Sequence, residues 1–109
     1  MNRVMDINSL LERLIKLTNE NKCQWDELSI TNYRLVLNEG TIQIKQTIED
    51  FNTTLYTIKL FDKSECFATF HSDDEDYRLN SLSEDLFNSI KKYRKRSISM
   101  KISDVFGDL

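Results

Sequence analysis

The chain has 109 residues and a formal net charge of −3, and 39% of its residues are hydrophobic while 30% are charged. This length suits one domain with one hydrophobic core, so we expect residues 1–109 to form a single domain. The lack of proline, the presence of only two glycines and the acidic balance argue against glycine-rich phosphate loops, proline-rich recognition segments and charge-driven nucleic-acid binding.

The first predicted element is an amphipathic helix between Ile7 and Thr18. Asp6 or Asn8 is suited to cap it, because a short polar side chain can accept from the free N–H groups of the first turn. Trp25 follows the helix, and we expect it to bridge helix and sheet, since aromatic side chains bury large areas. Apolar residues recur at three- and four-residue steps and form one helix face: Ile7, Leu10, Leu11, Leu14, Leu17 and Thr18.

Four strands are predicted next, over residues 33–37, 41–48, 55–61 and 66–71. Gly40 can adopt the positive φ of a tight hairpin loop, and the short turns between successive strands favour an antiparallel meander. Alternation directs one set of apolar side chains to the face that the helices should cover: Leu35, Leu37, Ile42, Ile44, Ile58 and Leu60.

A second helix is predicted to begin near Ser81 or Ser83 and to end near Arg96. Ser81 forms a capping box with Glu84, whereas a helix start at Ser83 allows Leu82 and Phe87 to form a hydrophobic staple. The apolar stripe of this helix consists of Leu82, Leu86, Phe87, Ile90 and Tyr93.

The segment 97–109 is compatible with three structures. Ile98, Met100 and Ile102 alternate with polar residues, as in a fifth strand, but an extension docked on the core or a free tail would fit the same residues. The expected class is therefore α+β. It is a four- to five-stranded antiparallel meander with an N-terminal and a C-terminal helix packed on one face, in the order α-β-β-β-β-α with a possible last strand.

The reverse face of the sheet is the leading candidate surface. It is predicted to be mixed, with polar residues and an apolar fringe, and either a partner protein, the C-terminal extension or a second copy of the chain would cover it. We expect a non-enzymatic protein-binding module of the inhibitor, immunity or accessory-chaperone type, with acidic residues complementing a basic target. The predicted contact residues are Leu55, Phe61, Phe67, Asp73, Asp74 and Asp76.

A basic run near the end of the second predicted helix supports an alternative function, nucleic-acid binding. The structural interpretation is favoured, because cations at a helix C-terminus interact with the negative end of the helix dipole. The residues of the run that would contact phosphates are Lys91, Lys92, Arg94, Lys95 and Arg96.

Catalytic and metal-binding motifs are weak in this sequence. His71 precedes the acidic segment 73–76, but neither the spacing of a calcium loop nor that of a zinc site is present, so a solvated turn is favoured and no cofactor is expected. A small-molecule enzyme or ligand sequesterer is the third functional class. Cys23 and Cys66 are expected to be reduced in a cytoplasmic chain without membrane segments, and a homodimer remains open.

Overall fold

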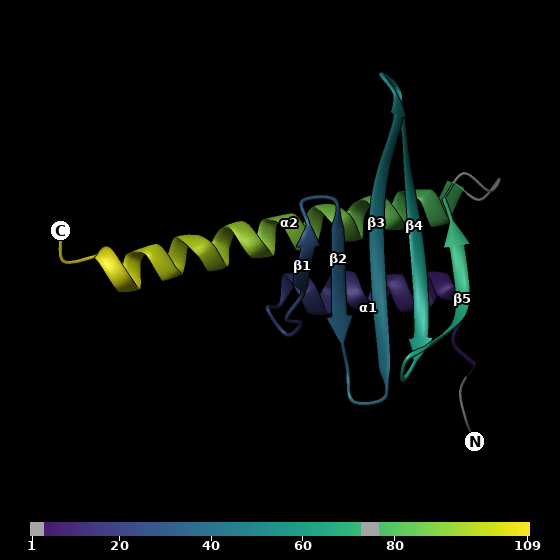
Figure 1. Ribbon diagram of the computed structural model, residues 1–109, viewed down its shortest axis with the longest axis horizontal. Coiled ribbons are helices and arrows are strands. Elements are labelled where there is room, and N and C mark those ends of the chain that lie inside the picture. The colour runs from purple at the N-terminus through teal and green to yellow at the C-terminus, as the bar shows by residue number, and fades with distance from the viewer. Residues whose placement is uncertain (1–3, 73–76) are drawn as a thin grey trace.

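The computed structural model describes residues 4–72 and 77–109, which form a helix, a five-stranded sheet and a long second helix (Figure 1). The strands lie side by side in sequence order, and each pairs antiparallel with the next. The predicted α+β meander with flanking helices is therefore confirmed. The elements are α1 (Ile7–Asn19), β1 (Asp26–Ser29), β2 (Asn32–Val36), β3 (Gly40–Asp50), β4 (Thr53–Asp62), β5 (Glu65–His71) and α2 (Tyr77–Phe106).

The fifth strand lies at a different place in the chain from the one suggested by the sequence. It is β1, which precedes the predicted meander and pairs with β2 through Asp26 opposite Arg34 and Glu27 opposite Tyr33. All four residues of β1 are exposed. An exposed edge strand shows no alternation between apolar and polar residues, so the periodicity that identifies half-buried strands does not reveal it.

A strand at 98–102, one of the three structures that the sequence left open for the segment 97–109, is contradicted, because residues 98–102 are part of α2. Ile98 and Ile102 are four residues apart, and Val105 follows three residues later, so the same apolar residues also fit a helix. Neither proline nor glycine occurs between residues 77 and 106 to stop the helix. The predicted end near Arg96 was wrong for the same reason.

The predicted start of the second helix at Ser81 or Ser83 was also wrong. Helix α2 begins at Tyr77, so both serines lie inside it and cap nothing. The buried Ser83 hydroxyl donates instead to the carbonyl oxygen of Leu79, one turn earlier, at 2.7 Å. This bond satisfies the hydroxyl group of a serine in a helix interior. The sequence pattern of a cap does not distinguish such an interior serine from a true capping serine.

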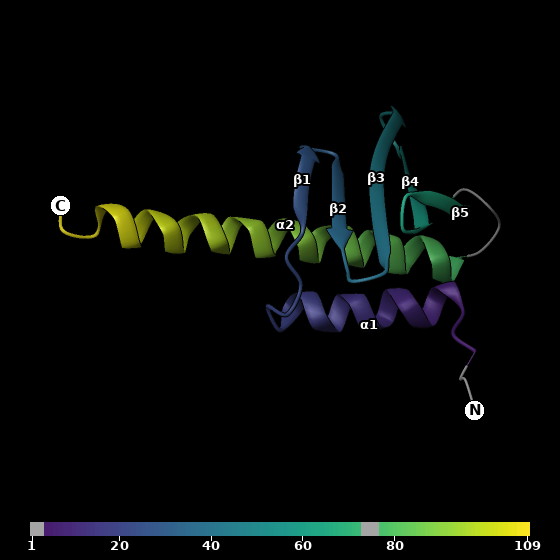
Figure 2. The ribbon, with the colours of Figure 1, turned by 60° about the horizontal axis from the view of Figure 1, so that its bottom comes forward.

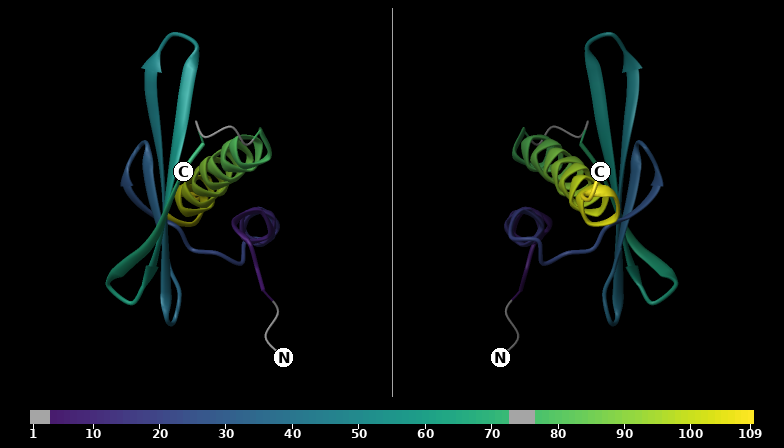
Figure 3. Two further views of the ribbon diagram at one scale, coloured as in Figure 1. Left: turned by 90° about the vertical axis from the view of Figure 1, so that its right-hand side faces the viewer. Right: turned by 90° about the vertical axis from the view of Figure 1, so that its left-hand side faces the viewer.

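The core lies between the sheet and the two helices, which pack on the same side of it (Figures 2 and 3). The Phe87 ring of α2 meets the rings of Tyr33 and Tyr56 at centroid distances of 5.4 and 5.5 Å. Four of the sheet residues predicted to face the helices are buried and Leu60 is half-buried, but Leu37 is 52% exposed. Leu37 follows the end of β2 and lines a groove together with Leu10 of α1.

Asp6 caps α1, since its carboxylate accepts from the backbone N–H of Ser9 at 2.8 Å. That hydrogen bond lowers the pKa of Asp6 below its ordinary value of 3.8. Because the pKa of Asp6 is lower in the folded chain than in the unfolded chain, the carboxylate stabilises the fold at pH values above its unfolded pKa. This stabilisation disappears as the pH falls through the folded pKa.

We therefore expect the Asp6 carboxylate to contribute a small stabilisation that depends on pH. The melting temperatures of the wild type and of Asp6→Asn should differ more at about pH 5 than at about pH 2, because asparagine caps without titrating. Circular dichroism melts at both pH values measure this difference. A difference that stays constant with pH would contradict the role assigned to this carboxylate.

Candidate functional site

The face of the sheet turned away from the helices is the candidate site, and we call it the open face. Among the described residues, no helix or loop covers it (Figure 3). The strand register places two rows of polar side chains across its centre. One row is Arg34, Gln43, Lys59 and Thr69, and the other is Asn32, Lys45, Thr57 and His71.

These rows enclose a shallow depression of about 330 Å³, which we call the polar hollow. Its floor is organised by two contacts: Gln43 Nε2 donates to Asn32 Oδ1 at 2.9 Å, and Thr57 Oγ1 lies 3.4 Å from His71 Nδ1. The residues that line the polar hollow are Asn32, Gln43, Lys45, Thr47, Thr57, Lys59 and His71. None of these lining residues, all in the described part of the chain, is acidic.

The charge of the polar hollow comes from Lys45 and Lys59, both exposed. In residues 4–72 and 77–109, neither ammonium group has a carboxylate within 4.0 Å. Arg34 differs, because it lies 3.8 Å from Asp26 on β1. Two lysines without a carboxylate partner among the described residues, surrounded by amides and hydroxyls, produce a local positive potential on a chain whose overall charge is negative.

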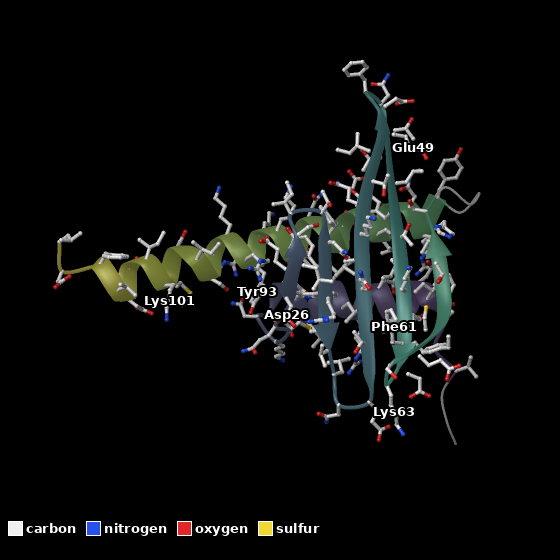
Figure 4. The ribbon with its side chains drawn as sticks, viewed as in Figure 1. Asp26, Glu49, Phe61, Lys63, Tyr93 and Lys101 are labelled. Carbon is white, nitrogen blue, oxygen red and sulfur yellow. The ribbon has the colours of Figure 1, made fainter. Side chains whose placement is uncertain are left out.

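Apolar side chains flank the polar hollow at its two ends. Leu55 and Phe61 point to the open face from β4, opposite Thr47 and Thr41 of β3, and both are half-buried. They are six residues apart on one strand, which corresponds to about 20 Å. The structure thus places these two predicted contact residues on the candidate face, but it does not bring them together. Figure 4 labels Phe61 at the lower end of β4.

Phe67 lies elsewhere, because β5 carries a bulge at this position. Ala68 pairs with Leu60 and Cys66 pairs with Phe61, which leaves Phe67 as the extra residue. Its side chain is 64% exposed and lines a groove of about 380 Å³ at the end of the sheet, which Leu10, Leu60 and Phe61 also line. The structure therefore brings Phe67 and Phe61 to one groove, outside the polar hollow. The predicted acidic contact residues Asp73, Asp74 and Asp76 lie outside the described residues.

The basic run lies in the middle of α2, not at its end. In the described chain, the last turn of α2 has no basic residue, so the helix-dipole explanation of the run was wrong. Lys91 Nζ lies 5.8 Å from the centre of the Phe87 ring. Arg94 is half-buried: its Nη1 donates to the Trp25 carbonyl oxygen at 2.9 Å, and its Nε lies 3.5 Å from Glu27 Oε1. Lys92, Lys95 and Arg96 are exposed.

The remaining candidate groups do not converge. Within the described ranges, no three side chains of the His, Cys, Asp and Glu types gather in a way that would hold a metal ion. Cys23 is buried and Cys66 is exposed, both are free, and burial raises the pKa of the Cys23 thiol. The buried hydroxyl groups of Tyr33 and Tyr56 likewise have their pKa raised by burial.

Sequence reasoning predicted a mixed reverse face with polar residues but did not recognise the polar hollow as a site. The usable signal was the two-residue alternation of β3 and β4, which predicts their orientation. Neither of the two described helices combines the length and the hydropathy needed to cross a bilayer. Comparisons with protein-family models, with curated protein sequences and with solved structures return no match for this chain.

Proposed function

We propose that this chain is a non-enzymatic protein-binding module whose open face holds an acidic segment of a partner protein. The observation that carries the proposal is the polar hollow, in which Lys45 and Lys59 have no carboxylate partner in the described chain. Carboxylates bound by ammonium groups form hydrogen bonds roughly twice as strong as those between neutral groups. A segment rich in Asp and Glu therefore complements this face.

The distribution of apolar and polar groups supports a protein as the partner. Leu55 and Phe61 flank the lysines, and interfaces combine apolar contacts of this kind with polar groups that fix the register. The amides and hydroxyls of the hollow add hydrogen-bond donors and acceptors that suit a peptide backbone.

The alternative of nucleic-acid binding by the basic run on α2 is less well supported. Arg94, at the centre of the run, already binds the Trp25 carbonyl oxygen and Glu27, so it is not available to a phosphate without losing these contacts. The net charge of −3 also opposes binding to a polyanion.

Reversing the charge of the hollow is expected to abolish acidic-peptide binding. We expect Lys45→Glu combined with Lys59→Glu to weaken binding of a fluorescent polyglutamate peptide by about a hundredfold, because each charged hydrogen bond contributes about 1.5–3 kcal/mol. Fluorescence anisotropy measures the affinity. In amide NMR spectra of the wild type, the peptide should shift the signals of Lys45, Thr57 and Lys59.

The matched control is Lys16→Glu combined with Lys92→Glu, which alters two exposed helix lysines and changes the net charge equally. This variant should keep the affinity within about threefold, since distant surface charges are screened by salt. Equal loss in both double variants would refute the site. Tighter binding of a single-stranded oligonucleotide than of the peptide would refute the proposed class of partner.

A further inference from the structure

The second half of α2 extends beyond the body of the molecule. Arg94 connects the helix to Trp25 and Glu27, and from there α2 continues past the free edge of β1 (Figures 1 and 2). Every residue from Lys95 to Leu109 is exposed. In Figure 4, Tyr93 lies near the edge of the sheet, whereas Lys101 lies well out on the protruding part. We call residues 95–109 the overhang.

The overhang carries an apolar stripe along one side of the helix. Ile98, Ile102, Val105 and Phe106 are separated by steps of four, three and one residues, so their side chains share one side at 3.6 residues per turn. They are 55%, 55%, 53% and 56% exposed. Ile98 also lines a groove with Glu27 and Tyr33, so the stripe begins at the edge of the sheet and continues away from it.

The total surface of the chain is large for its mass. The accessible area is 8193 Å², whereas folded monomers of 12.9 kDa expose about 6,300 Å². The excess is larger than the roughly 800 Å² that each partner buries in an interface of standard size. A contiguous exposed apolar stripe on such a chain is typical of an association surface.

We propose that the occupant of the apolar stripe is the same stripe of a second copy of this chain, and that the two overhangs pair antiparallel. The charge sequence along the helix supports this choice of partner and direction. Lys95, three residues before Ile98, lies on the side of the stripe at the start of the overhang, and Asp108 lies near its end. Antiparallel pairing places Lys95 of each copy near Asp108 of the other, whereas parallel pairing places like charges together.

The length of the overhang fits this arrangement. Ile102 lies at the centre both of the apolar stripe and of residues 95–109. When two copies cross antiparallel at Ile102, Phe106 at the end of each helix lies opposite Ile98 of the other, about 12 Å along the helix axis from its own Ile98. The residues after Phe106, with Asp108, thus lie near the partner's groove of about 290 Å³, which Ile98 lines together with Glu27, Lys91, Arg94 and Lys95.

The first test compares two substitutions on opposite sides of the same helix. Ile102→Asp introduces a carboxylate into the apolar stripe, whereas Met100→Asp introduces one on the other side, at a residue that is 62% exposed. Sedimentation equilibrium of the full chain in reducing buffer should give a dimer for the wild type and for Met100→Asp. Ile102→Asp should raise the dimer dissociation constant by about a hundredfold or more, because two charges would be buried without partners.

Circular dichroism must show that both variants keep the helix content of the wild type, which separates lost pairing from lost folding. The proposal would be overturned if Met100→Asp and Ile102→Asp weakened association equally. A wild type that stays monomeric at about 100 μM would also overturn it. If that monomer bound vesicles of phosphatidylserine and phosphatidylcholine, the stripe would be identified as a membrane-binding surface instead.

The direction of pairing has a separate test by charge exchange. Lys95→Glu should weaken the dimer about fivefold, since it places a carboxylate opposite the partner's Asp108. Lys95→Glu combined with Asp108→Lys should restore the wild-type dissociation constant, because the charges are exchanged and remain complementary. Failure of the combined variant to recover would overturn the antiparallel arrangement.

Discussion

Replacing Phe87 with alanine is expected to lower the free energy of unfolding by about 3–5 kcal/mol, the usual cost of removing a buried ring. The Phe87 side chain is 0% exposed and lies between α2 and the sheet, where its ring meets those of Tyr33 and Tyr56. The substitution removes the area buried by the ring and both aromatic contacts, and it leaves a cavity that two large rings cannot readily fill.

Urea denaturation followed by circular dichroism measures this loss, with the same slope expected for the wild type and the variant. Phe87→Leu is the matched control, since leucine fills much of the space and should cost clearly less than alanine. A loss below about 1 kcal/mol for Phe87→Ala would contradict the central position of this ring, because surface substitutions typically stay within about 0.5 kcal/mol.

Replacing Trp25 with alanine is expected to have a similar effect, again about 3–5 kcal/mol. Trp25 is 2% exposed, and its indole Nε1 donates to Thr18 Oγ1 of α1 at 3.0 Å. The loss therefore combines a cavity with the loss of the hydrogen bond to Thr18, which is itself 1% exposed. This residue joins α1 to the sheet, as the sequence predicted from its size and position.

The hydrogen bond can be measured separately from the packing. Thr18→Val keeps the shape of the side chain but leaves the indole N–H without an acceptor, which should cost about 1–3 kcal/mol. A double-mutant cycle with Trp25→Phe and Thr18→Val should give a coupling energy of about 1 kcal/mol. Additive effects would mean that the Thr18 hydroxyl does not bind the indole in solution.

The sequence predicted best the elements that have one buried face. Helix α1 and strands β3 and β4 bury alternate or helically spaced residues, and the buried Leu11, Leu14, Ile42, Ile44 and Ile58 made this periodicity visible. Strand β1 was missed because all its residues are exposed, so only its backbone pairing with β2 reveals it. The end of α2 was missed because Ile98, Met100 and Ile102 fit two periods at once, and the choice depends on whether the helix before them stops.

The candidate site was predictable in its orientation but not in its composition. Alternation along β3 and β4 is sufficient to place Lys45 and Lys59 on the reverse face. Their proximity to His71 requires the pairing of β3 with β4 and of β4 with β5, which depends on the turns and on the bulge at Phe67. The sequence prediction therefore emphasised the large apolar residues, whereas the structure draws attention to the polar centre between Leu55 and Phe61.

Cys23 is buried and Cys66 is exposed, so the reactivity of the two thiols can be used to follow local opening of the native structure. An alkylating reagent reaches the exposed Cys66 thiol directly, whereas Cys23 is only 4% exposed and reacts when the structure around it opens. The rate at which a second adduct appears, read by mass spectrometry, thus reports opening around Cys23 without any introduced label.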